Sequence, residues 1–321
     1  MSDAATTHHH ASPPPARISG RVFLALADIK LAHSVFALPF AILGAFLVAP
    51  RDPEQGSVRW ARFATMLGLV VVCMVLARTW AMLVNRVADR EIDAANPRTA
   101  RRAFARGALS PGDGAVMLAV CAIGFVAAAS LFGVLFANWW PAILALPVLA
   151  WIALYSYTKR FTWLCHVFLG GALAASPLAA AIAVGGPGSF ATDASGPVLF
   201  LLAGMVLCWV AGFDVIYALQ DLDHDREAGL NSVPARFGWR GTVWASRSLH
   251  ALALVSLGLA WRVEPRLGGL FLAAVVLVAG LLVWEHAVLA RRGKAGIPMA
   301  FFTLNGIVSV VLGTLGSLDV I

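Results

Sequence analysis

Charged residues are scarce in this chain. Only 13% of its 321 residues are Asp, Glu, Lys or Arg, while 60% are hydrophobic. A soluble domain carries about 25% charged residues, and no single core could bury so much apolar surface. This scarcity argues against a soluble protein and makes the lipid bilayer the expected solvent.

Cysteine is scarce as well. The four cysteines, Cys73, Cys121, Cys165 and Cys208, form no CxxC pair, and each lies within an apolar run. We interpret them as small buried apolar side chains. Their distribution argues against a disulfide framework and against a zinc site.

Long polar segments are missing beyond the first sixteen residues. That tail, 1–16, is polar and Pro-rich, and we expect it to be disordered. Apolar runs of about 20 residues, each able to span a bilayer as a helix, fill the rest of the chain. The sequence predicts an all-α integral membrane protein with nine transmembrane helices in a single domain, 17–321. We place the nine helices at 23–49, 63–88, 113–136, 139–157, 164–185, 197–220, 241–261, 267–290 and 299–318.

Basic residues are distributed unevenly over the predicted loops. With the N-terminus in the cytoplasm, sixteen Lys and Arg residues lie in inside segments and five lie in outside loops. An excess of basic residues is typical of cytoplasmic loops, so we expect this orientation in the cytoplasmic (inner) membrane. The net charge of +7 then indicates a face suited to anionic lipid headgroups or an anionic substrate, and it requires no nucleic acid as a partner.

Ionisable residues interrupt several apolar runs, always in the predicted cytoplasmic half. Such residues are costly in lipid and usually line an internal cavity or pair with one another. Their shared depth predicts one central polar cavity that faces the cytoplasm. These residues are Asp28, Lys30, His33, Arg78, Arg247, His250, Glu285 and His286.

Two acidic stretches occur at the predicted cytoplasmic ends of apolar runs. Asn85, Asp89 and Asp93 are four residues apart, a spacing that stacks them along one face of a helix. Asp221 and Asp225 repeat the spacing further along the chain. Carboxylates one helical turn apart repel each other unless a cation lies between them. Oxygen-only ligands suit Mg²⁺, which typically bridges carboxylates to the phosphates of a substrate.

The two stretches correspond residue by residue at an offset of 132 positions, and Pro, Arg and a hydroxyl residue follow each of them. We hypothesise an internal duplication in which the second and sixth predicted helices, 63–88 and 197–220, are equivalent. Such a pair would place two acidic faces opposite each other, backed by basic residues. That arrangement suits a diphosphate, because metal ions and Arg side chains together neutralise its oxygens.

The motifs "NRVADREID" (85–93) and "QDLDHD" (220–225) resemble the two Asp-rich motifs of the UbiA superfamily of membrane-embedded aromatic prenyltransferases. The nine predicted helices agree with that family, so the resemblance covers almost the whole chain. The strings "FTWLCH" and "GLNSVPARFG" are most similar to the 4-hydroxybenzoate polyprenyltransferase branch, and they lean toward enzymes of the futalosine route to menaquinone.

The resemblance implies a Mg²⁺-dependent transfer of a polyprenyl group from its diphosphate to the ring of an aromatic acid, in the synthesis of a respiratory quinone. Either 4-hydroxybenzoate or a 1,4-dihydroxy-6-naphthoate would serve as acceptor, and the prenyl tail would lie among the helices, open to membrane lipid. The catalytic residues implied are Asp89, Asp93, Asp221 and Asp225, which with Asn85 would hold two Mg²⁺ ions.

The resemblance also implies roles for the surrounding residues. Basic side chains would neutralise the rest of the diphosphate, and tyrosine rings would shield the allylic cation with their π-faces. Lys30 or Arg78 would bind the acceptor carboxylate, and His33 is a candidate for the ring proton. The candidates for neutralising the diphosphate are Arg86, Arg98, Arg102, Lys159 and Arg160. The candidates for shielding the allylic cation are Tyr155, Tyr157 and Tyr217.

A secondary transporter of a charged solute is the alternative. Internal repeats and ionisable residues within helices would suit a transporter. The acidic residues, however, cluster at one end of the helices and not at the midplane, which favours the enzyme.

Overall fold

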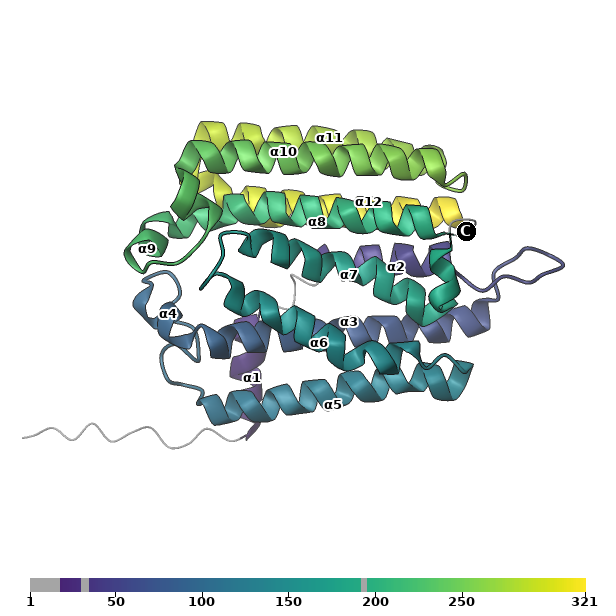
Figure 1. The fold of residues 1–321 in the computed structure, drawn as a ribbon, viewed down its shortest axis with the longest axis horizontal. Helices are drawn as coiled ribbons and strands as arrows, with labels where there is room; N and C mark the ends of the chain where they lie inside the picture. Colours follow the sequence, from purple (N-terminus) through teal and green to yellow (C-terminus); the bar gives the residue numbers. More distant parts are fainter. Residues whose placement is uncertain (1–17, 30–34, 192–194) are drawn as a thin grey trace, which may run out of the picture.

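Eight helices in the described part of the chain are long and apolar enough to cross a membrane. The computed structural model describes residues 18–29, 35–191 and 195–321. Figure 1 shows the long helices running side by side along one direction. They are α3 (Trp60–Ala88), α5 (Pro111–Phe136), α6 (Trp140–Thr158), α7 (Cys165–Gly185), α8 (Gly196–Ala218), α10 (Val233–Val263), α11 (Gly269–Arg292) and α12 (Asn305–Val320). Within the described ranges there is no β-strand, so the prediction of an all-α integral membrane fold is confirmed.

The first predicted helix, 23–49, is not continuous. Its place is taken by α1 (Ile18–Ile29), which crosses the direction of the long helices in Figure 1, and by α2 (Leu38–Leu47). Pro39 lies in the first turn of α2, where its missing N–H costs nothing, and so favours a new helix start there. With ten residues α2 is about 15 Å long, half of a bilayer core. The described residues therefore hold eight long spanning helices and not nine.

Some of the sequence predictions fall outside the described residues. These are the disordered tail 1–16 and the two candidate site residues Lys30 and His33. Asp28, at the end of α1, is described: its carboxylate accepts a hydrogen bond from the Ala103 N–H at 3.0 Å. This bond joins α1 to the loop between α4 and α5.

The largest core cluster surrounds α8. Trp209 of α8 and Phe40 of α2 are almost completely buried, and Phe271 of α11 joins the same cluster. α8 is apolar on every side, which suits lipid and protein surroundings alike, and its packing against α7 and α10 gives it a central position. Gly170 allows α7 to approach α8 closely, since a Cβ atom at this position would lie 2.4 Å from the carbonyl oxygen of Leu207 in α8.

Both acidic stretches break their helices at the same position of the motif. After α3 the chain bends at Asp89 (φ −96°, ψ 10°) and continues as α4 (Arg90–Ala95). After α8 a single 3₁₀ turn ends at Asp221 (φ −102°, ψ 8°), and α9 (Leu222–Glu227) follows. We expected continuous helical faces, so the break corrects that expectation. The matching backbone angles support the proposed duplication, and Figure 1 shows α4 and α9 at the same end of the bundle.

Candidate active site

The two acidic stretches line a single cavity of about 740 Å³ between the long helices. Most of its wall is apolar and comes from α3, α5, α6, α7 and α8, while its polar part lies where α4 and α9 begin. The motif residues Asn85, Asp89, Asp93, Asp221 and Asp225 all line it. Segments more than a hundred residues apart in the chain thus contribute carboxylates to one space.

Each carboxylate of the first stretch is paired with a cation. Asp89 accepts hydrogen bonds from Arg160 at 3.2 Å and from the Asn85 amide at 2.7 Å. Burial raises the pKa of Asp89, and the hydrogen bond from Arg160 acts in the opposite direction. Asp93 is paired with Arg102, whose Nη1 lies 2.7 and 2.8 Å from the two carboxylate oxygens.

Asp221 in the second stretch is held by the loop that follows the first stretch. Arg98 donates from Nε and Nη2 to the two carboxylate oxygens of Asp221, at 2.9 and 2.5 Å. Asn96 adds a third hydrogen bond at 2.9 Å. Because Asn96 precedes Pro97, its backbone is extended, and the chain leaves α4 there toward α8. The local sequence after the first motif therefore completes the site of the second.

Asp225 is the most deeply buried of the four carboxylates. It is fully buried and is bonded to Lys159 at 2.6 Å and to the Ser232 hydroxyl at 3.0 Å. Lys159 belongs to the loop between α6 and α7, as does Arg160, which reaches Asp89. A buried carboxylate is costly without a counter-charge, so this loop stabilises both stretches.

The donor atoms of the site suit Mg²⁺ shared with a phosphate. Among the described residues, no three His, Cys, Asp or Glu side chains could enclose a metal ion by themselves. Mg²⁺ seldom uses an all-protein cage: it keeps water and takes one or two carboxylates together with substrate phosphates. Two pairs of carboxylates with an Asn amide, and cations beside each, fit that mode of binding.

Two arginines of α3 reach the cavity with unused donors. Arg86 donates from Nη1 to the Asn85 amide oxygen at 2.7 Å. The Nε–H groups of Arg78 and Arg86 are buried and have no hydrogen-bond partner among the described residues. Arg78 lies eleven residues before Asp89, about 16 Å deeper along the helix. Arg78 is half-buried, and its unpartnered Nε–H makes it a candidate for a second anion site below the acidic layer.

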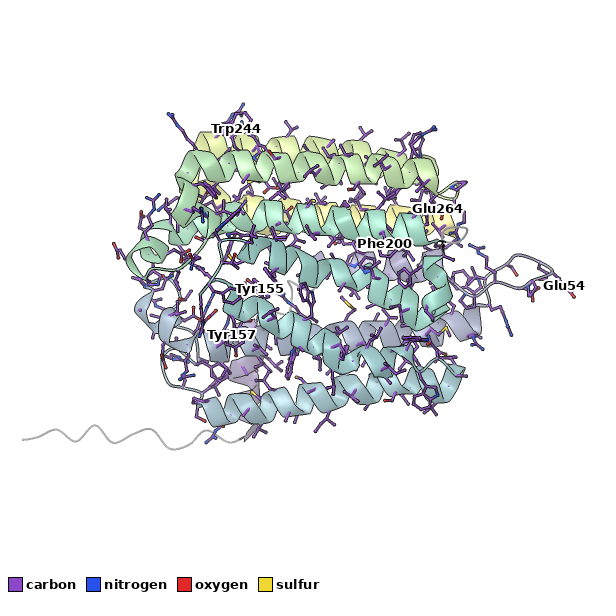
Figure 2. All side chains as sticks on the ribbon, viewed as in Figure 1. Glu54, Tyr155, Tyr157, Phe200, Trp244 and Glu264 are labelled. Carbon is purple, nitrogen blue, oxygen red and sulfur yellow. The ribbon has the colours of Figure 1, made fainter. Side chains whose placement is uncertain are left out.

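Two of the three candidate tyrosines line the cavity, Tyr155 from α6 and Tyr217 from α8. Tyr157 is not among the residues lining the cavity. It is 43% exposed, and the Arg160 guanidinium lies 5.3 Å from its ring centroid. Figure 2 labels Tyr155 and Tyr157 near the end of α6. Residues two apart on a helix point in different directions, so the cation-shielding role expected of Tyr157 does not fit its position.

Sequence reasoning missed a second pair in the cavity wall. The ring nitrogen Nδ1 of His166 (α7) lies 2.7 Å from the Asp214 carboxylate (α8), and the Val233 N–H donates to Nε2 at 3.3 Å. Because Nε2 accepts, the ring proton is on Nδ1 and points to Asp214. Asp214 is seven residues, or two helical turns, before Asp221, so the sequence indicates its place next to the second acidic stretch but not its partner. Nothing in the sequence connects His166 to this pair.

We predicted that the ionisable residues within the helices all line one polar cavity, and this prediction is wrong for some of them. Asp28 and Arg78 line the cavity, whereas His250, Glu285 and His286 do not. His250 and His286 lie 3.2 Å apart, on α10 and α11, in a separate cluster. The sequence indicated how far along its helix each ionisable residue lies, but it did not indicate toward which neighbouring helix the side chain points.

Comparison with known proteins identifies the family of this chain. A model of the UbiA prenyltransferase family matches residues 37–307. This chain belongs to the UbiA prenyltransferase family. The resemblance predicted from the two Asp-rich motifs is therefore confirmed, and UbiA membership makes the protein a prenyltransferase. All thirteen candidate site residues within the described ranges, leaving Tyr157 aside, line the one cavity.

Several individual UbiA-family proteins are similar along most of the chain. A 4-hydroxybenzoate octaprenyltransferase of Ectopseudomonas mendocina is 32% identical over 282 residues, 87% of this chain and 86% of that protein. One of Yersinia pestis is 29% identical and covers 78% of this chain and 81% of its own.

Solved structures of UbiA homologues show the same fold. The apo structure of a UbiA homologue from Aeropyrum pernix K1 superposes with a TM-score of 0.76 at 29% identity, over 91% of this chain and 99% of that one. A homologue from Archaeoglobus fulgidus bound to GPP and Mg²⁺ has a TM-score of 0.62 at 16% identity, over 94% and 99% of the two chains.

Proposed function

We propose that the protein transfers a polyprenyl group from polyprenyl diphosphate to the ring of an aromatic carboxylic acid, with Mg²⁺, in the biosynthesis of a respiratory quinone. The observation that carries this proposal is the meeting of both acidic stretches in one cavity, with a cation on every carboxylate. The names of the similar octaprenyltransferases support an acceptor of the 4-hydroxybenzoate type. The motif strings that lean toward menaquinone enzymes keep 1,4-dihydroxy-6-naphthoate as the second acceptor to test.

The acidic layer would bind the diphosphate end of the donor. Asn85, Asp89 and Asp93 on one side and Asp221 and Asp225 on the other would hold two Mg²⁺ ions. Bound Mg²⁺ supplies Lewis-acid stabilisation of the charge that develops on the departing diphosphate.

Basic side chains beside the carboxylates would neutralise the remaining phosphate oxygens. Arg98, Arg102, Lys159 and Arg160 already lie within hydrogen-bond distance of the four carboxylates. Arg86 adds an unused Nε–H at the same level. Because these cations already pair with the carboxylates, binding of the donor and its metal would rearrange existing ion pairs.

The lower part of the cavity would hold the acceptor and the first isoprene units. Arg78 would offer its guanidinium, whose Nε–H is unpartnered, to the acceptor carboxylate, and Tyr155 and Tyr217 line the same cavity. As the C1–O bond breaks, its electron pair leaves with the diphosphate. An electron-rich ring carbon then bonds to C1, and the ring loses a proton. Apolar walls keep water away from the allylic cation.

Orientation belongs to the same proposal. The basic residues predict that the end of the bundle with α4 and α9 faces the cytoplasm. Labelling with a membrane-impermeant thiol reagent tests this through Glu91→Cys, an exposed position on α4. We expect reaction in inside-out vesicles and not in intact cells.

The function is tested with purified protein, a polyprenyl diphosphate and each of the two aromatic acids, with and without Mg²⁺. We expect a prenylated acid, identified by mass spectrometry, that forms only with the metal. Uptake of an unchanged charged solute into sealed vesicles, with no product, would instead support the transporter.

A further inference from the structure

A short π-helix precedes α12 at the same end of the bundle as the acidic stretches. It spans Met299–Leu304, and Phe301 within it lines the cavity. Figure 1 shows α12 starting at the end where α9 lies. Single π turns are rare and occur frequently at functional sites. None of the functional roles assigned so far uses this turn.

Asn305 anchors the π turn through its side-chain amide. Its Oδ1 accepts a hydrogen bond from the Trp209 indole at 2.6 Å, while its Nδ2 donates to the Ala300 carbonyl at 2.8 Å and to Glu285 at 3.3 Å. Asn305, Glu285 and Ala300 are fully buried, and Trp209 nearly so. A buried amide with both ends bonded fixes the backbone that carries the neighbouring Phe301.

Phe301 stacks on Tyr217, whose other contacts lead to the diphosphate site. The two ring centroids are 4.1 Å apart, and the planes are inclined by 33°. Arg98 lies 5.5 Å from the Tyr217 centroid and donates to its hydroxyl at 3.2 Å. The same guanidinium holds both carboxylate oxygens of Asp221. An unbroken series of contacts therefore leads from the π turn to Asp221.

Phe301 is also fixed from its other sides. Its ring lies 5.3 Å from the ring of Phe213 and 5.6 Å from that of Phe36, both in edge-to-face geometry. Such pairs have preferred orientations, so they restrict the ring of Phe301 and, through it, that of Tyr217. Arg98, by contrast, is a long side chain on a loop, one-third exposed, and needs a support to keep one geometry.

We propose that Phe301 and Asn305 are positioning residues for the diphosphate site: the π turn holds Tyr217, and Tyr217 holds the Arg98 guanidinium in place for Asp221 and the donor diphosphate. This inference rests on the proposed function, because it takes Arg98 as a diphosphate-binding group. It adds two residues that act through Tyr217 and Arg98.

The test is binding of geranyl diphosphate with Mg²⁺ to the purified full chain, measured by isothermal titration calorimetry. Phe301→Leu should weaken binding about tenfold, and Asn305→Ala should weaken it in the same direction. Phe301→Tyr keeps the ring stack and should bind like the wild type. Thermal unfolding shows whether each variant is folded, and Phe301→Leu remains informative if Asn305→Ala is not.

Phe200→Leu is the matched control. Phe200 is on α8, 57% exposed, and Figure 2 labels it toward the end of α8 that is far from α9. We expect its affinity to stay within about twofold of the wild type. Wild-type affinity in Phe301→Leu would overturn the inference, whereas absence of binding by the wild-type protein would overturn the proposed function and the inference with it.

A double-mutant cycle separates positioning from general packing. If Phe301 acts through Arg98, then Phe301→Leu should cause no further loss in the Arg98→Ala background. Independent, multiplicative losses would show that Phe301 supports the fold alone and would contradict the proposal.

Discussion

The two acidic stretches have the same spacing and the same bend, yet they differ in what surrounds them. In the first, the side chains of Asp89 and Asp93 are 22% and 9% exposed, and Arg102, which pairs with Asp93, comes from the adjoining loop. In the second, Asp221 and Asp225 are 12% and 1% exposed, and both cations come from other parts of the chain.

The two stretches therefore differ in where their hydrogen-bond donors and counter-charges come from. The loop after the first stretch supplies Arg98 and Asn96 as hydrogen-bond donors to Asp221. Among the described residues, the loop after the second stretch supplies no donor to Asp89 or Asp93. The loop between α6 and α7 serves both stretches through Lys159 and Arg160. The two similar motifs thus form an asymmetric site, in which Asp221 of the second stretch depends on the loop after the first for its counter-charge.

The largest expected effect is on catalysis, and it should be similar for both stretches. Asp89→Asn or Asp221→Asn removes one charged ligand and should lower kcat by about two to four orders of magnitude. Glu54→Gln is the control, since Figure 2 shows Glu54 on a loop at the opposite end of the molecule. Steady-state kinetics with saturating substrates and Mg²⁺ checks the result. Near-normal turnover in either variant would show that its stretch holds no catalytic metal.

Stability should separate the two stretches. Lys159→Met leaves the carboxylate of Asp225, which is 1% exposed, without its cation and should destabilise the protein by about 2–4 kcal/mol. Arg160→Met affects the more exposed Asp89 and should cost about 1 kcal/mol or less. Thermal unfolding of both variants without substrate gives the comparison. Equal losses would contradict the asymmetry.

A smaller effect distinguishes the acidic layer from the deeper anion site. Arg78→Gln removes a charged donor about 16 Å from Asp89 along α3 and should raise KM for the aromatic acid about tenfold to a hundredfold. The affinity for geranyl diphosphate should hardly change. Steady-state kinetics with each substrate varied in turn measures both. A parallel loss of donor affinity would place Arg78 in the diphosphate site.

Much of this could be read from the sequence because the spacing of charged residues in an apolar chain is informative. Asp89 and Asp221 were visible as repeated acids at helix ends, and they do line one cavity. The bends at these residues were not visible, since a four-residue spacing fits a continuous helix equally well. The break between α1 and α2 was missed because apolar composition gives the length of a run but not its continuity, although Pro39 was a signal for a new helix start.

Contacts between distant segments that share no motif were beyond sequence reasoning. His166 and Asn305 are polar residues in apolar surroundings, and their partners Asp214 and Trp209 come from another helix. Periodicity assigns a residue to a face of its own helix, but only packing decides which helix that face meets. Tyr157 illustrates the opposite error, because its neighbour Tyr155 lines the cavity while Tyr157 points elsewhere.

The most direct test replaces Mg²⁺ with Mn²⁺ in crystals grown with geranyl diphosphate and locates the metal by anomalous diffraction. We expect manganese at both acidic stretches, next to Asp89 and Asp93 on one side and Asp221 and Asp225 on the other, with one diphosphate between them. Manganese at only one stretch, or a diphosphate bound away from both, would contradict the account.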